Sequence, residues 1–144
     1  MTRRDRDISD LPHALLVDES LMVRRVGARI IRDLGYQVSE AETGSEALDM
    51  ARLSMPDVIL CDWRVGDMDA GAVMEALRAE PGGEDVVVIL CTADRRVERI
   101  TQALAAGASE YIMKPFDSDI IESKLALAGL FVRAATPQPD YADA

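Results

Sequence analysis

Short apolar runs recur along the chain, separated by longer segments whose apolar residues have helical spacing. The runs are too short for helices and most are rich in branched side chains, which is typical of parallel strands buried on both faces. They therefore predict five strands of one sheet. These strands cover His13–Val17, Gln37–Ala41, Val58–Trp63, Val86–Cys91 and Tyr111–Met113.

Each run is followed by a segment with apolar residues three and four positions apart, which predicts an amphipathic helix. The clearest helix lies between Ser20 and Gly35. The others begin near Thr43, Asp69, Arg95 and at Asp117 or Ser118. The fourth helix is expected to bury Val97, Ile100, Thr101 and Leu104. Strand and helix thus alternate five times, and the handedness of parallel crossovers favours a doubly wound α/β sheet with five helices.

Polar residues stand where the predicted strands end. Asp18 and Glu19 follow the first strand, Asp62 lies at the end of the third, and Thr92 and Lys114 follow the fourth and fifth. Because the carboxyl ends of neighbouring parallel strands share one edge, we expect these side chains to converge. Two carboxylates about 5 Å apart repel by roughly 3 kcal/mol at a dielectric constant near 20. A Mg²⁺ ion would relieve this repulsion, since it prefers carboxylates, water and a phosphate oxygen.

Asp62, at the centre of the sheet, is the best-placed nucleophile of this cluster. Aspartate forms acyl phosphates, and catalysis then comes mainly from positioning and charge neutralisation. Thr92 and Lys114 carry groups suited to phosphoryl oxygens. Lys114 precedes Pro115, and an X-Pro bond can be cis at modest cost, which would aim the ammonium into the crevice.

Length, charge and hydropathy restrict the domain organisation, the partners and the location expected for this protein. A chain of 144 residues favours one domain, with residues 1–12 as a flexible arm, 13–130 as the folded domain and 131–144 as a flexible tail. The net charge of −10 argues against DNA or anionic lipid as a partner. No apolar stretch is long enough to span a bilayer and no signal peptide is evident, so we expect a cytoplasmic protein.

The two cysteines, Cys61 and Cys91, each precede a candidate site residue, so strand alternation points both into the core. We expect two reduced, buried thiols. A redox pair is possible only if their strands are neighbours in matching register. His13, the only histidine, is expected to be a passive residue at the opposite end of the first strand.

Four segments together resemble the receiver domain of two-component response regulators. They are Val17-Asp18-Glu19-Ser20, Leu60-Cys61-Asp62, Cys91-Thr92-Ala93 and Tyr111-Ile112-Met113-Lys114-Pro115-Phe116. The resemblance covers about His13 to Leu130. It implies a flavodoxin-like fold with strand order 2-1-3-4-5.

The resemblance also implies roles for individual residues. Asp62 would be the phosphoacceptor, and a histidine kinase the donor. Mg²⁺ would be held by Asp18, Glu19, Asp62 and the backbone carbonyl of Arg64. Thr92 would be the switch hydroxyl, Lys114 the cation that contacts the phosphoryl group, and Tyr111 the switch aromatic residue.

The chain departs from the family's pattern after the phosphoacceptor. Val65-Gly66 stands where the family usually has Met-Pro, so we expect a more mobile loop. Arg64 is unusually large and cationic for its position. We hypothesise an ion pair between Arg64 and Asp94 over the site; the alternative is two independent exposed side chains.

No output domain follows Leu130 in the sequence, so we expect signalling through another protein. The resemblance is strongest to single-domain, CheY-like chemotaxis regulators, which implies a flagellar motor switch protein bound at the fourth helix, last strand and fifth helix. A phosphate sink or an adaptor in a developmental or stress phosphorelay would have the same site. A haloacid-dehalogenase-type phosphatase is a further alternative, but it needs a second Asp where Arg64 stands. A receiver-like module that never takes phosphate would not need the complete residue set. We therefore expect a signalling protein and not an enzyme acting on small substrates.

Overall fold

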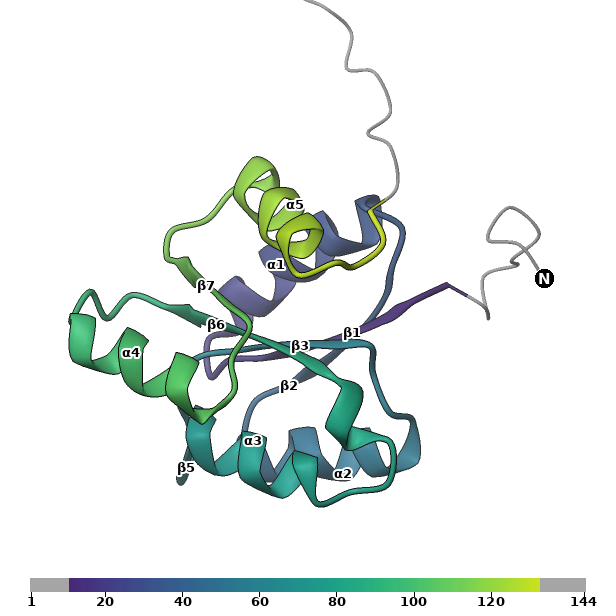
Figure 1. Cartoon of the computed structure of the whole chain (residues 1–144). Helices are drawn as coiled ribbons and strands as arrows, with labels where there is room; N and C mark the ends of the chain where they lie inside the picture. Colours follow the sequence, from purple (N-terminus) through teal and green to yellow (C-terminus); the bar gives the residue numbers. More distant parts are fainter. Residues whose placement is uncertain (1–10, 133–144) are drawn as a thin grey trace, which may run out of the picture.

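A computed structural model describes residues 11–132 and contains a five-stranded parallel sheet (Figure 1). The strand order is β2-β1-β3-β6-β7, which is the predicted order 2-1-3-4-5 once the strands of this sheet are numbered alone. The strands are β1 (His13–Val17), β2 (Gln37–Ala41), β3 (Val58–Cys61), β6 (Val87–Thr92) and β7 (Glu110–Met113). The predicted doubly wound α/β fold is confirmed.

Five α-helices flank the sheet, α1 and α5 on one face and α2, α3 and α4 on the other (Figure 1). Four of them begin at a side chain that accepts a hydrogen bond from a backbone N–H three residues later, which stabilises the first turn. These cap residues are Ser20, Thr43, Asp69 and Asp117. The helices are α1 (Leu21–Asp33), α2 (Gly44–Leu53), α3 (Ala70–Arg78), α4 (Val97–Ala106) and α5 (Ser118–Leu127), with a 3-10 turn η3 (Gly83–Asp85). None of the helices described is long and apolar enough to cross a membrane.

The sheet separates two apolar cores because alternate residues of each strand face opposite sides. On β1, Leu15 and Val17 lie in the core under α2 and α3, whereas Ala14 and Leu16 lie in the core under α1 and α5. All four are almost fully buried. The central strands are covered on both faces, so only their ends are accessible. A binding site on these strands is therefore expected where the strands end.

Helix α4 buries a different side from the one predicted. Val97 is 71% exposed and Leu104 is 42% exposed, whereas Ala103 is fully buried. The helix contacts the core through this small side chain, so larger apolar residues on other sides of the helix remain at the surface. The predicted inward face of Val97, Ile100, Thr101 and Leu104 was therefore wrong for all but Ile100, which is half-buried.

The ends of the folded unit extend slightly beyond the predicted limits. The carbonyls of Leu11 and Pro12 accept hydrogen bonds from Gln37, at 3.1 and 2.8 Å. At the other end, the Phe131 carbonyl accepts a hydrogen bond of 2.5 Å from the Tyr36 hydroxyl. The rest of the predicted arm and tail, residues 1–10 and 133–144, lies outside the described residues.

The segment after β3, where Val65-Gly66 predicts a more mobile loop, forms a short antiparallel hairpin, β4 (Arg64–Val65) and β5 (Met68–Asp69). Gly66 makes the turn possible because its φ of +77° is readily adopted only by glycine. Its N–H donates a 2.7 Å hydrogen bond to Glu19 Oε1. This loop is therefore tied to the end of β1.

Candidate functional site

Asp62 lies directly after β3, at the carboxyl edge of the sheet. Its N–H donates to the Val17 carbonyl of β1 at 3.1 Å, which fixes its backbone to the neighbouring strand. Its Oδ1 accepts a 2.6 Å hydrogen bond from the Trp63 N–H, and its side chain is 25% exposed. The second oxygen, Oδ2, faces a partly accessible crevice, where it accepts a hydrogen bond from Lys114.

Asp18 follows β1 and is only 5% exposed. Its N–H donates to the Ala41 carbonyl at 3.1 Å, and its Oδ1 accepts from the Ser20 N–H at 2.9 Å. Arg24 Nη1 donates to the Asp18 carbonyl at 2.6 Å. These bonds hold a buried carboxylate in one orientation. Arg24 is thus engaged at the site, a contact that the sequence pattern did not predict.

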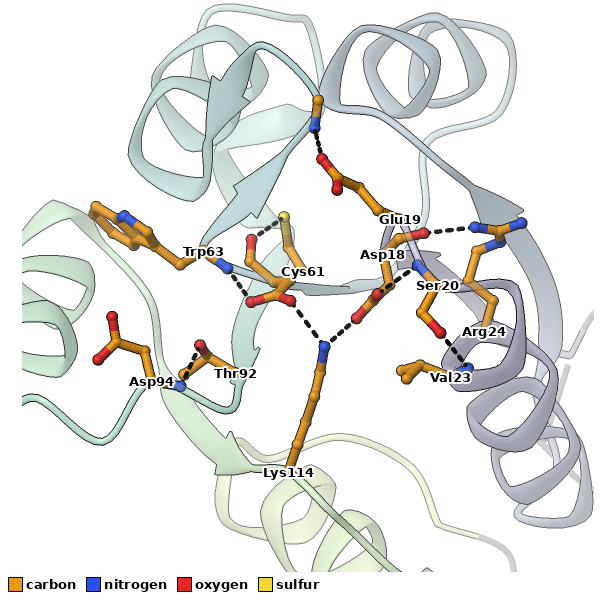
Figure 2. A network of polar contacts seen from close by, with 12 residues as sticks. Asp18, Glu19, Ser20, Val23, Arg24, Cys61, Trp63, Thr92, Asp94 and Lys114 are labelled. Carbon is orange, nitrogen blue, oxygen red and sulfur yellow. Dashed lines mark hydrogen bonds and ion pairs between the residues drawn. The ribbon is translucent and has the colours of Figure 1, made fainter.

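Lys114, one residue after β7, joins the two aspartates (Figure 2). Its Nζ lies 2.8 Å from Asp62 Oδ2 and also donates to Asp18 Oδ2. Burial opposes the charged form of Lys114, but the hydrogen bonds to Asp18 and Asp62 outweigh it and hold its pKa above the ordinary value of 10.5. The peptide bond between Lys114 and Pro115 is cis.

Glu19 does not join this cluster. Its carboxylate binds the Gly66 N–H, away from the point where Asp18 and Asp62 meet (Figure 2). Within the described part of the chain, no group of three or more His, Cys, Asp or Glu side chains is arranged to hold a metal. The expected convergence of three carboxylates was therefore wrong for Glu19, because its side chain accepts the hairpin N–H, while the single charge of Lys114 lies between the two aspartates.

The donor chemistry at the crevice nevertheless fits Mg²⁺. Asp18 and Asp62 already bind one cationic group together, so their oxygens lie within reach of a single cation. Both offer hard carboxylate oxygens, and Asp62 is partly open to water, as a partly hydrated Mg²⁺ requires. Glu19 and the Arg64 carbonyl follow these two residues closely in sequence, and their part in metal binding stays a prediction.

Thr92 ends β6 and is 2% exposed. Its Oγ1 accepts a 3.0 Å hydrogen bond from the Asp94 N–H, and its carbonyl accepts from the Lys114 N–H at 2.9 Å. The hydroxyl therefore lies at the same sheet edge as Lys114. Its own proton is available to a further acceptor.

Tyr111, the predicted switch aromatic residue, is half-buried on β7. Lys124 Nζ lies 4.8 Å from the centroid of its ring and 2.8 Å from Glu110 Oε1. A cation at this distance from an aromatic face is attracted to it. The ring is thus in contact with α5 as well as with its own strand.

The hypothesised ion pair between Arg64 and Asp94 is absent from the described residues. Asp94 instead binds Arg96, with Oδ2 2.6 Å from Nη2, and lies 3.7 Å from Arg99 Nε. Arg96 is only two residues away and binds the carboxylate through both its backbone N–H and its side chain, whereas Arg64 belongs to the separate hairpin. These two partners of Asp94 were not predicted, although arginines two and five residues after an aspartate are close enough to reach it.

The two thiols are buried on opposite faces of the sheet, Cys61 in the core with Leu15 and Cys91 in the core with Leu16. A redox pair between them is excluded by this geometry. Burial raises the pKa of both thiols, that of Cys91 to about 12. Both cysteines are core residues, as expected.

The pH dependence of Asp94 is a first testable consequence. Hydrogen bonds from Arg96 hold the pKa of Asp94 at about 2, below its ordinary 3.8. A carboxyl with a depressed folded pKa stabilises the folded protein above pH 3.8 and loses this contribution as the pH falls toward 2. Side-chain NMR titration should give a value near 2, and Arg96→Gln should return it toward 3.8. An unshifted value in the unmodified protein would contradict the observed pairing.

Comparison with known proteins identifies the class to which this site belongs. The family described as the response regulator receiver domain matches residues 14–126. The chain therefore belongs to the receiver-domain family. The chemotaxis protein CheY of Pseudomonas aeruginosa is 30% identical over 112 residues, which are 77% of this chain and 90% of the relative. Chemotaxis protein CheY-3 of Vibrio cholerae is 32% identical over 112 residues, covering 77% and 86%.

Solved structures agree with the fold. The chemotaxis response regulator CheY4 of Vibrio cholerae has a TM-score of 0.76 at 26% identity, covering 82% of this chain and 98% of that one. The receiver domain of sensor histidine kinase PA1611 from Pseudomonas aeruginosa has a TM-score of 0.73 at 28% identity, covering 82% and 98%. In that receiver, magnesium is coordinated in the active-site cleft. Several of the proteins similar to this chain are thus chemotaxis regulators.

Proposed function

We propose that this protein is a response regulator that accepts a phosphoryl group on Asp62 from a histidine kinase. The observation that carries the proposal is the convergence of Asp18, Asp62 and Lys114 at the carboxyl edge of the sheet. Such a site holds a nucleophilic carboxylate, a second carboxylate for a divalent ion, and a cation for phosphoryl oxygens. The receiver-domain family match supports the same chemistry.

Some residues of the site would bind the metal ion, and others would bind the phosphoryl group. Asp18, Glu19, Asp62 and the Arg64 carbonyl would hold Mg²⁺, which neutralises phosphoryl charge when bound. Lys114 keeps its positive charge at neutral pH, since its hydrogen bonds to the two aspartates hold its pKa above the ordinary 10.5 despite its burial, and it can contact phosphoryl oxygens after leaving the Asp62 carboxylate. A phosphorylated Asp62 also offers new acceptors to the Thr92 hydroxyl.

Movement of Thr92 would alter the surface that receives the signal. In the proposed switch, Thr92 turns toward the phosphoryl group and Tyr111 fills the space it leaves, which biases α4, β7 and α5 toward a second arrangement. Apolar side chains already lie exposed on these helices. They are Val97, Leu104, Ile120 and Leu127.

The proposed output is phosphorylation-dependent binding of another protein at the face of α4, β7 and α5. Relatives named as chemotaxis proteins favour a flagellar motor switch protein as that partner. Binding that strengthens when Asp62 is phosphorylated would support this output. Competition for the kinase with no downstream partner would instead indicate a phosphate sink.

The proposal is tested through Trp63, the only tryptophan and the neighbour of Asp62. We expect its fluorescence to change on addition of Mg²⁺ and again on addition of acetyl phosphate or beryllofluoride. In Asp62→Ala, the second response should disappear, since the phosphoryl acceptor is gone. Mg²⁺ should also raise the melting temperature, because it binds the folded crevice and not the unfolded chain. A second response that persists in Asp62→Ala would refute Asp62 as the acceptor.

A further inference from the structure

We propose that Arg99 is a positioning residue that holds the loop between β6 and α4 in its observed arrangement by binding Asp94 and Trp63 together. In this role Arg99 sets how readily Thr92 can turn toward a phosphoryl group on Asp62. The inference rests on the proposed function and adds to it an element that controls the movement of Thr92. Three independent sets of contacts lead to it.

The first set concerns Trp63, which is only 6% exposed beside the phosphoacceptor. Its backbone N–H binds Asp62, but its indole Nε1 is buried without a hydrogen-bond partner in the described part of the chain. A buried indole N–H normally finds an acceptor, and its absence has a free-energy cost. The position of the ring therefore depends on packing and on Arg99, not on a hydrogen bond of its own.

The second set concerns Arg99 itself. Its guanidinium carbon lies 5.2 Å from the centroid of the Trp63 ring, within the range of a cation–π contact. Its Nε lies 3.7 Å from Asp94 Oδ2, and its side chain is 32% exposed, against 63% for Arg96. Arg99 and the buried Ala103 are four residues apart, so both lie on the side of α4 that faces the domain.

The third set joins Asp94 to the switch hydroxyl. The Asp94 N–H donates to Thr92 Oγ1 at 3.0 Å, a bond drawn in Figure 2. If Thr92 turns toward a phosphoryl group, this bond must lengthen or break. Arg96 and Arg99 bind the Asp94 carboxylate and so keep the loop in place, which opposes the movement of Thr92.

These contacts form a continuous path around the site, from Asp62 through Trp63, Arg99 and Asp94 to Thr92. Arg96 binds Asp94 more closely, but among the contacts of the described residues only Arg99 joins Asp94 to Trp63. Removing Arg99 should free the loop and lower the cost of the Thr92 movement. The phosphorylated arrangement should then form more readily.

The experiment compares Arg99→Gln and Arg99→Lys with Arg95→Gln. Arg95 is exposed two residues before the start of α4, so its substitution removes the same charge without removing the contact with Trp63. With Mg²⁺ present, we expect Arg99→Gln to bind beryllofluoride about three- to tenfold more tightly, a range typical of losing one modest contact. Arg99→Lys, which keeps a cation over the ring, and Arg95→Gln should stay close to the unmodified protein.

A second measurement needs no phosphoryl analogue. In the free protein, Arg99→Gln should speed hydrogen exchange of the Asp94 N–H and shift Trp63 emission, whereas Arg95→Gln should do neither. Unchanged exchange and unchanged beryllofluoride affinity in Arg99→Gln would overturn the proposal, as would an equal effect of Arg95→Gln. If the unmodified protein itself does not respond to beryllofluoride, the proposed function fails, while the free-protein measurement still decides the role of Arg99.

Discussion

Replacing Lys114 by methionine is expected to raise the affinity of the protein for Mg²⁺ about tenfold, which corresponds to about 1.4 kcal/mol. The Lys114 ammonium now lies between Asp18 and Asp62, where a metal ion would bind the same carboxylates. Two unit charges 4 Å apart interact by about 4 kcal/mol at a dielectric constant of 20. Because the lysine stem can move its charge toward water, only part of this repulsion is expected in the measured affinity.

The measurement is a Mg²⁺ titration followed by Trp63 fluorescence in both proteins. Lys124→Met is the matched control, since Lys124 is similarly buried and also paired, with Glu110 at 2.8 Å. Lys124→Met removes one positive charge from α5 and should leave the midpoint of the Mg²⁺ titration near that of the unmodified protein. Unchanged or weaker Mg²⁺ binding in Lys114→Met would show that the ion does not compete with this ammonium.

Much of the fold was predictable because short-range patterns and sheet geometry agree. Strand β2 begins and ends where the sequence predicts, and the caps Thr43 and Asp69 begin their helices as expected. The convergence of Asp62 and Lys114 was also predictable, since parallel strands bring their carboxyl ends to one edge. These features depend on residue type and position along the chain.

Features that depend on side-chain competition were not predictable in the same way. Glu19 was expected to converge with Asp18 and Asp62, but its carboxylate accepts the Gly66 N–H of the hairpin, whose pairing was not predicted. The predicted inward face of α4 was wrong for most of its residues, so the contacts of Arg99 with Trp63 and Asp94 were not predicted. In both cases the partner is set by tertiary packing between distant segments, which periodicity alone does not encode.

A substitution at Gly83, in the turn before β6, is expected to cause a large loss of stability. A Cβ atom added at Gly83 would lie 1.9 Å from the Leu77 carbonyl oxygen, so the backbone itself would have to move. Arg78 Nη1 also donates to the carbonyls of Gly83 and Val86, at 2.8 and 2.6 Å, which fixes the entry into β6. We expect Gly83→Ala to lower the free energy of unfolding by about 3 kcal/mol or more, measured by urea denaturation.

Gly107→Ala separates this steric effect from the cost of an unfavourable backbone conformation. Gly107 has a φ of +119°, but a Cβ there would meet no atom within 4 Å. The conformational cost alone is about 1–2 kcal/mol, so Gly107→Ala should be the milder substitution. An equal or smaller loss in Gly83→Ala would mean that the end of α3 can shift away from η3. In that case the start of β6, the strand that carries Thr92, would not be fixed by this turn, and the position of the switch hydroxyl would depend on the sheet alone.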